Sequence, residues 1–499
     1  MKNFKDALDR SALLTIIGLT VAIALVLSRG DLTLPKVRDF TWEGRTIGVE
    51  DTAFVLTFNR PMERESVEKN LIINPYLPGK KSWAGRRMAY TLDKPAPYGN
   101  TYSLKLEGAR EKYYGGEQGK LIQPFQSFFN SRDRALVYIG LEGEEKGRLM
   151  LVNFEAINPK PIALTPSSLA VMDYQFYPQG DRILFSAIER KNTLPTLSEQ
   201  QLFTVTTGIN PVAPGEETEP PQEAGQVKLI LDNKDYQNLK FDLSPDGKTI
   251  LVQRVSRQDT TDAAPWIIEE GKKPQYLTDN EGKIQQGGDF LIAPDSQSVV
   301  LLQGQGTAIL PLHPETDSSE DLMFLPKFGR VLSFARDGSQ ATMVQYNSDG
   351  TRSLYIVTNQ GTEQEVFKTE AYGNIIEAKF DPTKTVLYCL LSRVLEDEEE
   401  YEEELYIAKL NLKTNELTTL IILPNQREVE ISLSPDGLTL LFDQTITQAT
   451  GENEGGKEAI ATSSRIWLLP LEETSTDTSE TKIQPQKLPF IGFSPRWLP

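Results

Sequence analysis

Two stretches of the sequence are nearly identical: Leu243-Ser-Pro-Asp-Gly-Lys-Thr-Ile-Leu-Val-Gln253 and Leu433-Ser-Pro-Asp-Gly-Leu-Thr-Leu-Leu-Phe-Asp443. In each, an apolar run leads into Ser-Pro-Asp-Gly and a second apolar run follows. Proline presets φ at the first turn position, aspartate hydrogen-bonds its own backbone, and glycine accepts a positive φ. Because the flanking residues are mostly β-branched, aromatic or otherwise apolar, each stretch predicts two antiparallel strands joined by a tight turn.

Weaker copies of this turn recur at five further places. Successive copies lie roughly 40 to 70 residues apart, which is the period range of propeller blades. Two more apolar runs follow each hairpin, for example Ser353-Leu-Tyr-Ile-Val357 and Glu363-Gln-Glu-Val-Phe367. Four short strands per unit predict the blade of a β-propeller. The weaker copies are Tyr177-Pro-Gln-Gly-Asp181, Ala293-Pro-Asp-Ser296, Ala335-Arg-Asp-Gly338, Asp381-Pro-Thr-Lys384 and Ser494-Pro-Arg-Trp497.

The two ends of this region are incomplete in complementary ways. Three predicted strands, Ala135–Leu141, Arg148–Phe154 and Pro161–Thr165, have no turn motif before them, and the C-terminal run Phe490–Trp497 is a strand without a blade. We expect the C-terminal strand to complete the first blade and close the ring, because closure removes exposed sheet edges. Counting this composite blade with the six others predicts about seven blades.

The turn motif resembles the WD-like repeat of bacterial propellers of the TolB type, in which a Ser-Pro-Asp-Gly turn joins the two inner strands. The resemblance covers residues 131–499 and is specific at Ser244–Gly247 and Ser434–Gly437. It departs at Arg336 and Thr383, where the turn loses its proline or its Asp-Gly. Such propellers make protein contacts and gate peptidase domains, so the resemblance implies a binding role.

Composition separates the parts of the chain and disfavours nucleic acid as a partner. The 499 residues carry 52 Lys and Arg against 70 Asp and Glu, a net charge of −18. Residues 36–130 hold 15 basic and 11 acidic side chains, about +4, whereas residues 131–499 hold 33 and 56, about −23. A surface this acidic repels phosphate backbones. Cys389 is the only cysteine; it excludes an intrachain disulfide and is expected to be a small buried side chain.

The N-terminus predicts a membrane anchor. Residues 1–10 are polar with three basic side chains, and Ser11–Ser28 contains no charge. An 18-residue helix is about 27 Å long, which just spans the hydrocarbon core. We expect residues 1–34 to form a cytoplasmic stub and an uncleaved signal anchor in the inner (cytoplasmic) membrane, with the bulk of the chain in the periplasm or cell exterior. The alternative is a signal peptide cut near Ala22-Ile-Ala24.

Residues 35–130 predict a separate β-sandwich. Phe54–Phe58 alternates between apolar and polar positions, and some seven short strands fit within about 95 residues, as in immunoglobulin-like folds. The motifs Phe54-Val-Leu-Thr-Phe-Asn-Arg-Pro-Met62, Ser66-Val67, Ile73-Asn-Pro75 and Tyr98-Gly-Asn-Thr-Tyr102 resemble the bacterial Ig-like domain of surface-layer (SbsA-type) proteins. That resemblance implies an extracytoplasmic spacer or adhesion module without catalysis.

Two charged segments allow both a functional and a structural interpretation. The first is the basic segment Lys80-Lys-Ser-Trp-Ala-Gly-Arg-Arg87. In the functional interpretation it is a contact face for anionic lipid, for a polyanion or for the acidic propeller. In the structural interpretation it is an ordinary hairpin with Trp83 in the core. Glu396–Glu404 is either a loose Ca²⁺ site or a solvated rim loop; it lacks the glycine of an ordered calcium loop. The polar loops Asn210–Pro221, Gln448–Ser464 and Glu472–Thr481 are expected to be disordered.

The sequence offers no recognisable catalytic constellation. His313 is the only histidine, and no Gly-x-Ser-x-Gly elbow accompanies it. One His and one Cys do not supply a histidine-based metal centre, and phosphate-binding loops are absent. Carboxylate pairs for glycoside chemistry stay open, because spacing in three dimensions is not visible in the sequence. We therefore assign no catalytic, cofactor-binding or metal-binding residues.

These observations predict an all-β, membrane-anchored protein that is a non-catalytic binding platform. The expected ligand is a protein or an envelope polymer that binds the propeller rim loops. Two alternatives remain: a propeller enzyme, a lyase or hydrolase acting on a sugar or lactone with a channel metal, and a structural envelope spacer. Three or more inward carboxylates at one depth would favour the enzyme, whereas an apolar and neutral lining would favour the platform.

Overall fold

The computed structural model describes most of the chain as strands. The residues described are 7–28, 33–112, 119–156, 159–190, 197–209, 222–304, 306–313, 323–325, 327–395, 403–452, 458–471 and 484–499. They form two compact units. The first unit comprises Met1–Arg45, Thr52–Asp93 and Thr101–Phe129; the second comprises Thr46–Asp51, Lys94–Asn100 and Asn130–Pro499. The expected boundaries at residues 34/35 and 130/131 stay a prediction.

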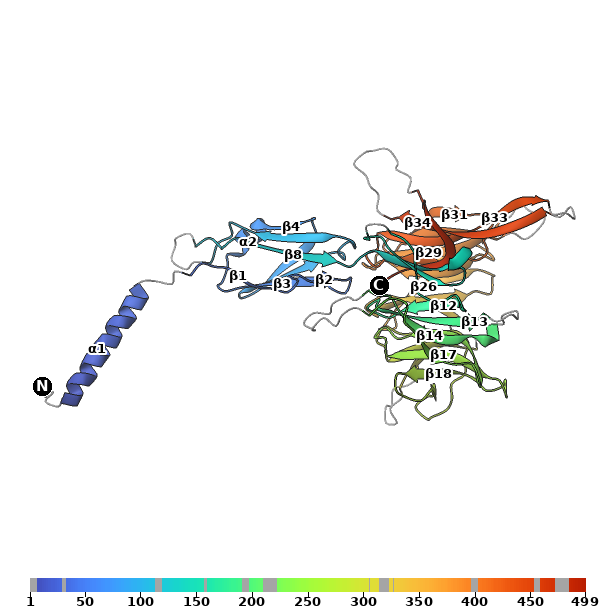
Figure 1. Ribbon diagram of the computed structural model, residues 1–499, viewed down its shortest axis with the longest axis horizontal. Coiled ribbons are helices and arrows are strands. Elements are labelled where there is room, and N and C mark those ends of the chain that lie inside the picture. The colour runs from blue at the N-terminus through green and yellow to red at the C-terminus, as the bar shows by residue number, and fades with distance from the viewer. Residues whose placement is uncertain are drawn as a thin grey trace. The chain divides into compact units, whose positions relative to one another are not determined.

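The apolar N-terminal segment is helical, as expected. Helix α1 spans Ala7–Ser28, and its side chains from Ser11 to Ala24 are all exposed (Figure 1). None of the helices within the described residues is both long enough and apolar enough to span a bilayer. The membrane anchor therefore stays a prediction.

The first unit contains strands of two sheets that face each other across an aromatic core. Helix α2 (Arg64–Asn70) precedes β4. Phe40 packs edge-on against Phe54, and Trp42 lies 5.2 Å from Phe129 between ring centroids. The alternation expected for Phe54–Phe58 is present, because Phe54, Leu56 and Phe58 are buried. One sheet has the order β1 (Val37–Phe40), β3 (Ala53–Phe58), β6 (Arg87–Leu92), β5 (Gly79–Ala84); the other has β2 (Thr46–Ile47), β8 (Phe125–Ser131), β7 (Thr101–Leu106), β4 (Leu71–Asn74).

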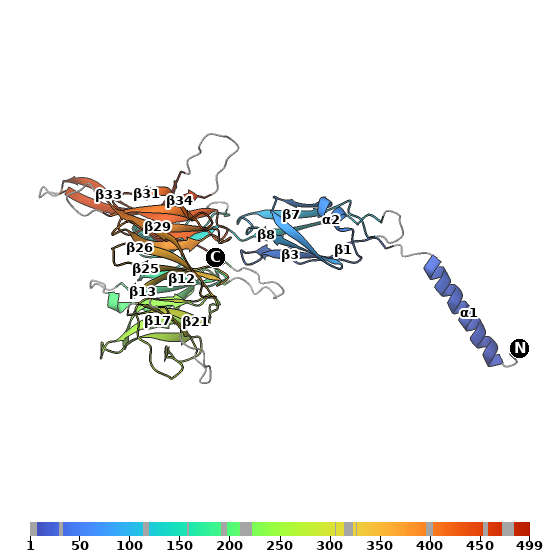
Figure 2. The same ribbon diagram turned by 180° about the vertical axis from the view of Figure 1, so that it is seen from behind.

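The second unit contains five four-stranded antiparallel sheets among its described residues, and Figures 1 and 2 show them from opposite sides. In each sheet the strands follow chain order, as expected for propeller blades. The first holds β12 (Leu169–Phe176), β13 (Arg182–Glu189), β14 (Gln201–Thr206) and β15 (Val227–Leu231). The second holds β16 (Tyr236–Leu243), β17 (Thr249–Ser256), β18 (Ala263–Glu269) and β19 (Gln275–Tyr276). The third holds β20 (Phe290–Ile292), β21 (Ser298–Gln303), β22 (Gly306–Pro311) and β23 (Met323–Leu325). The fourth holds β24 (Arg330–Phe334), β25 (Gln340–Tyr346), β26 (Arg352–Thr358) and β27 (Glu363–Lys368). The fifth holds β28 (Asn374–Phe380), β29 (Val386–Val394), β30 (Glu403–Asn411) and β31 (Glu416–Leu423).

A seven-stranded sheet joins the end of the chain to the start of this unit. Its order is β11 (Ile162–Ala163), β10 (Leu149–Asn153), β9 (Ala135–Gly140), β35 (Gln486–Trp497), β34 (Glu458–Pro470), β33 (Thr439–Glu452), β32 (Ile431–Leu433). The first half of β35 pairs with β34, and its second half pairs antiparallel with β9. This confirms that the C-terminal strand joins the three strands that lack a turn motif. β35 therefore belongs to both ends of this unit, and the number of about seven blades stays a prediction.

Six of the seven predicted turns share one backbone geometry. The N–H of the fourth residue donates to the carbonyl of the first, and the N–H of the first donates to the carbonyl five residues later, all at 2.8 to 3.0 Å. The fourth residue has φ between 57° and 77°, including the non-glycine residues Ser296 and Lys384. The backbone geometry therefore persists where the motif departs, as it does at Arg336 and Thr383. The six turns begin at Tyr177, Ser244, Ala293, Ala335, Asp381 and Ser434.

Two expectations about the end of the chain are wrong. Ser494-Pro-Arg-Trp497 is not a turn, because it lies within β35, where it pairs with β9. The segment Gln448–Ser464 is only partly a loop, because β33 and β34 pair from Gln448–Ala461 up to Glu452–Glu458. Residues 453–457 lie outside the described residues, as do 210–221 and 472–483.

Mixed apolar clusters fill the space between successive sheets. One cluster combines Tyr177 and Leu184 of one sheet with Phe241 and Val252 of the next. Cys389 is buried in another such cluster, which confirms that it is a small core side chain. Sheets that pack face to face in this way form a rigid support for the loops at their edges.

Candidate functional site

The only histidine stands apart from any catalytic partner. His313 follows β22 and is half exposed, and its Nε2 lies 3.6 Å from Oε1 of Glu269. Within the described residues, no hydrogen bond joins a serine or cysteine to His313, and Cys389 is buried elsewhere. Burial raises the pKa of the Cys389 thiol to about 12, so this thiol is not poised as a nucleophile. In the part of the chain that the structure describes, His313 therefore has no serine or cysteine nucleophile hydrogen-bonded to it, as a Ser-His or Cys-His mechanism would require.

The basic hairpin of the first unit combines features of both interpretations. Trp83 is partly buried: its ring stacks on Phe58 at 6.0 Å, and its Nε1 donates to Oε1 of Glu68 at 2.8 Å. Lys81 also reaches the backbone carbonyl of Glu68, and the other basic side chains of the segment are exposed. Trp83 thus anchors the hairpin while the cations lie in solvent. The acidic run 396–404 lies mostly outside the described residues, as only 403 and 404 are placed.

Charged side chains gather on the first strand of each sheet of the second unit. We call β12, β16, β20, β24, β28, β32 and the second half of β35 the inner strands. Contacts between them, such as β24 with β28 and β32 with β35, bring consecutive inner strands together. The charged side chains on or directly beside these strands include four carboxylates (Asp173, Asp289, Glu377, Glu430) and four cations (Lys240, Arg330, Lys379, Arg496).

These eight side chains neutralise one another. Nη2 of Arg496 lies 2.8 Å from Oδ1 of Asp173 and 3.2 Å from Oε2 of Glu430. Its guanidinium also stacks over the ring of Tyr174 at 4.7 Å. Burial lowers the pKa of Arg496, but the carboxylates of Asp173 and Glu430 outweigh it and raise that pKa overall. Arg496 therefore stays charged and ties β12, β32 and β35 together.

The remaining pairs follow the same arrangement on other inner strands. Asp289 forms an ion pair with Lys240 and lies 3.5 Å from Nε of Arg330. Lys379 lies 3.5 Å from Glu377 on the same strand. The observed pattern is neither of those expected, since these eight side chains of the inner strands are paired with one another and form neither a set of unpaired carboxylates nor an apolar and neutral lining. Glycoside chemistry needs one protonated and one ionised carboxyl free to face a substrate, and cations hold the carboxylates of this set.

Two further carboxylates are buried and accept hydrogen bonds from backbone N–H groups on or beside other strands. The two oxygens of Asp443 accept the backbone N–H groups of Glu430 at 2.8 Å and Ser494 at 3.0 Å. Burial raises the pKa of Asp443 to about 6, against these two hydrogen bonds, which lower it. Asp242 likewise accepts the N–H of Ile292 at 2.6 Å, and burial raises its pKa. A raised pKa can mark a functional acid, but here both carboxylates accept hydrogen bonds from backbone N–H groups.

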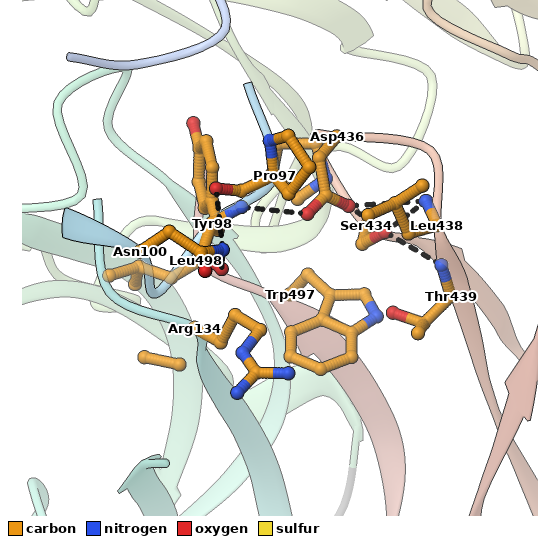
Figure 3. A pocket seen from close by; sticks show the side chains of 12 residues that line it. Pro97, Tyr98, Asn100, Arg134, Ser434, Asp436, Leu438, Thr439, Trp497 and Leu498 are labelled. Carbon is orange, nitrogen blue, oxygen red and sulfur yellow. Dashed lines mark hydrogen bonds between the residues drawn. The ribbon is translucent and has the colours of Figure 1, made fainter. Parts of the chain in front are cut away.

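A cavity of about 180 Å³ lies beside the second Ser-Pro-Asp-Gly turn (Figure 3). Its walls come from four segments of the second unit: the loop 94–100, residues 134 and 135, the turn at 434–439, and residues 497 and 498 at and after the end of β35. Oδ2 of Asp436 accepts the backbone N–H of Tyr98 at 3.0 Å, and Oδ1 accepts the hydroxyl of Ser434 at 2.6 Å. The indole of Trp497 forms part of the wall. Figure 3 shows these side chains around the cavity.

The loop 94–100 beside the cavity is held in place by two hydrogen bonds of Tyr98, one through its backbone N–H and one through its hydroxyl. Its hydroxyl accepts the backbone N–H of Val49 at 3.2 Å, and only 4% of the residue is exposed. Burial raises the pKa of Tyr98, while the charge of Arg132 lowers it in part. The phenol is therefore neutral and acts as a structural hydrogen-bonding group.

Sequence reasoning named none of the residues that line this cavity as a site. The available signal was the last copy of the motif, where Arg496 and Trp497 replace Asp-Gly. That departure lies within β35, which places Arg496 against Asp173 and Glu430 and Trp497 in the wall of the cavity. Among the described residues, no group of three or more His, Cys, Asp or Glu side chains is arranged to hold a metal ion.

Comparison with known proteins shows likeness in fold only. No family model matches the chain, and no curated protein matches it either. Oligogalacturonate lyase from Vibrio parahaemolyticus is 11% identical, with a TM-score of 0.42 over 66% of this chain and 90% of that chain. TolB from Acinetobacter baumannii is 10% identical, with a TM-score of 0.38 over 86% and 83%. A putative 6-phosphogluconolactonase from Bacteroides fragilis is 12% identical, with a TM-score of 0.42 over 74% and 98%.

The sheets and their order define an all-β protein with propeller-like sheets. The similar structures include enzymes and a protein that is not named as one, at identities too low to carry an activity across. The immunoglobulin-like assignment of residues 35–130 receives no support from these comparisons and stays a prediction.

Proposed function

We propose that this protein is a membrane-anchored, extracytoplasmic binding platform without catalytic activity of its own. Its partner is a protein or an envelope polymer that contacts the connections at the rims of the propeller-like unit. The observation that carries the proposal is the self-neutralised charge on the inner strands, typified by Arg496 between Asp173 and Glu430. Ion pairs of this kind fix neighbouring strands, and they hold the charged side chains of this set against one another instead of leaving them free for a substrate.

Rigidity supports the same proposal. Apolar clusters fill the spaces between sheets, and β35 joins the last strands to the first. A rigid scaffold holds its loops in fixed positions, so binding costs less conformational entropy than it would on a mobile surface. The strongly acidic composition of residues 131–499 favours a partner that is cationic or neutral over nucleic acid.

The membrane anchor belongs to this proposal. Helix α1 presents apolar side chains all round, with Leu14 70% exposed and Ile16 61% exposed. A helix that is apolar on every face is unfavourable in water and is stabilised by lipid or by protein contact. We place it in the cytoplasmic membrane with the N-terminus inside and the remaining chain in the periplasm or outside the cell. Residues 35–130 then act as an immunoglobulin-like spacer.

Crosslinking in native membranes tests the platform. The full chain and a control that carries residues 1–34 fused to the same tag are expressed at equal levels and crosslinked, and captured proteins and glycans are identified by mass spectrometry. We expect at least one envelope partner with the full chain that the control does not capture. Recovery of the same set from both samples, with the full chain folded, contradicts the proposal.

The same purified chain tests the two alternatives. Metal analysis and a screen of uronate oligosaccharides and lactones test the enzyme hypothesis, because turnover or a stoichiometric metal would replace the platform with catalysis. Size-exclusion chromatography with light scattering tests the spacer hypothesis, which predicts self-association without any other partner. Neither result is expected if the rims of the propeller-like unit bind a partner.

A further inference from the structure

The chain enters the first unit at an end that Asn59 holds together. The N–H of Asn59 donates to the carbonyl of Lys36 at 3.1 Å, and its Nδ2 donates to the carbonyl of Leu34 at 3.1 Å. Its own carbonyl accepts Nη1 of Arg86 at 3.1 Å. The segment that follows α1 is therefore fixed against the end of β3 and the hairpin between β5 and β6. We call this part of the first unit the entry end.

Two further segments complete the entry end. The N–H of Gln123, just before β8, donates to the carbonyl of Pro35 at 2.9 Å. The N–H of Lys112 donates to the carbonyl of Pro61 at 2.9 Å. The described segments that meet at the entry end are therefore 34–39, 59–64, 84–87, 110–112 and 119–123.

The entry end concentrates the positive charge of the first unit. Its five segments carry nine cations and three carboxylates, a net charge of +6. One of the carboxylates, Glu111, is buried and paired with Arg60 at 3.1 Å. Within the described residues, four exposed cations of this end have no carboxylate within 4 Å, namely Lys36, Arg38, Arg86 and Arg87. These four charges are available to an anionic partner.

Two leucines lie exposed among the cations. Leu34 is 45% exposed and Leu121 is 48% exposed. Leu121 follows Lys120 directly and forms a β-bridge with Arg110. A surface that combines exposed leucines with lysines and arginines suits the boundary between phospholipid headgroups and acyl chains, because it gains from both apolar burial and attraction to phosphate.

The chain also limits how far the entry end lies from a bilayer that holds α1. Lys36 is eight residues beyond Ser28, the last residue of α1, so the two are at most about 28 Å apart. A tether this short keeps the entry end at a high effective concentration beside the headgroups. Electrostatic attraction acts over about 8 Å at physiological salt, so the cations are attracted whenever the entry end approaches the surface.

We propose that the entry end binds the anionic phospholipid headgroups of the bilayer in which α1 is anchored. The four unpaired cations contact lipid phosphates, and the two exposed leucines lie at the level where the acyl chains begin. This inference rests on the membrane anchor of the proposed function and adds a second contact, which orients the first unit on the membrane. The acidic second unit is the other partner that these cations could attract, and the exposed leucines and the short tether favour lipid over it.

The test uses the full chain in lipid nanodiscs with one added cysteine that carries an environment-sensitive fluorophore. Because Cys389 is buried, labelling of the folded chain modifies only the added cysteine, and the unaltered chain is the blank. Leu121→Cys reports the entry end, Thr101→Cys reports the opposite end of β7, and Leu14→Cys reports α1. Nitroxide groups near the headgroup end of the acyl chains quench a label that touches lipid. Discs contain either phosphatidylcholine alone or phosphatidylcholine with about one-third phosphatidylglycerol.

We expect lipid quenching at residue 121 to be at least about threefold stronger in the anionic discs, since each Lys or Arg near an anionic surface strengthens binding about fivefold. High salt is expected to remove this difference. The combined change of Lys36, Arg38, Arg86 and Arg87 to Gln should reduce quenching to the level of neutral discs. The matched control, the combined change of Lys272, Lys273, Lys283 and Lys413 to Gln, removes four exposed cations of the second unit and should leave quenching unchanged. Residue 101 should not be quenched in either disc, and residue 14 should be quenched in both.

The three labels separate failure of this proposal from failure of the anchor. If residue 14 is quenched but residue 121 is quenched equally in neutral and anionic discs, or not at all, the entry end does not bind anionic headgroups. If salt changes the emission at residue 121 without any lipid quenching, the cations face the acidic second unit instead. If residue 14 is not quenched, the anchor is wrong and this proposal fails with it. Should the fourfold variant of the entry end not fold, lipid composition and salt still decide on the chain that keeps all four cations.

Discussion

Asp443 makes the stability of the second unit depend on pH in a predictable direction. Its carboxylate is buried, accepts two backbone N–H groups, and has a pKa raised from 3.8 to about 6. A carboxyl whose pKa is higher in the folded state binds its proton more tightly there than in the unfolded chain. Stability from this group is therefore full below pH 3.8 and is lost as the pH rises to about 6.

The size of the effect follows from the shift. A pKa difference of about two units corresponds to about 3 kcal/mol of unfolding free energy. For a unit of about 370 residues the entropy of unfolding is about 0.8 kcal/mol per kelvin, so the difference amounts to about 4 °C in Tm. Asp443→Asn keeps the shape of the side chain but does not ionise. We expect Tm of the variant, relative to the unaltered chain, to rise by about 4 °C between pH 4 and pH 7.

Scanning fluorimetry of both chains at a fixed heating rate measures this difference. Asp349→Asn is a matched control, since hydrogen bonds from Thr351 and Lys368 lower the pKa of that exposed carboxylate. A lowered pKa contributes stability above the unfolded value, so this control is expected to give a constant difference between pH 5 and pH 7. If the Asp443→Asn difference changes by less than about 1 °C across the range, the buried carboxylate does not titrate as argued.

Three further perturbations test individual contacts. Arg496→Met leaves two carboxylates without their cation and is expected to cost about 3 kcal/mol, or about 4 °C in Tm. Lys228→Met removes the cation of an exposed pair and is expected to cost less than about 1 °C, so equal losses would contradict the inner-strand network. Gly437→Ala adds a Cβ 2.6 Å from the proline ring of a neighbouring turn, whereas the Cβ of the control Gly361→Ala, at a similar positive φ, meets nothing within 4 Å. Calorimetry should therefore show a Tm at least about 2 °C lower for Gly437→Ala than for Gly361→Ala. Cys389 should react with a thiol-specific dye only after denaturation, and labelling of the folded chain at the rate of a free thiol would show that its cluster opens.

The turn motif was readable because its physics is local. Pro, Asp and Gly each constrain the backbone within four residues, so two clear copies sufficed to find strands of four-stranded sheets. The weaker copies were also recognisable, because their apolar flanks persisted where Arg336 or Thr383 replaced the motif residues. The end of the chain was partly misread, since Ser494-Pro matched the motif locally while pairing with β9 made it a strand.

The sequence by itself determined the all-β composition, the repeated hairpins, the apolar N-terminal helix and the burial of Cys389, because each depends on neighbours along the chain. Only the tertiary structure decided how the charges of the inner strands pair and where the cavity beside Trp497 lies. Arg496 meets Asp173 more than 300 positions earlier in the chain, and Tyr98 meets Asp436 over a similar separation. Contacts of that range depend on how the sheets pack, and no local pattern of residue types encodes the distance between two carboxylates or the space left between four segments.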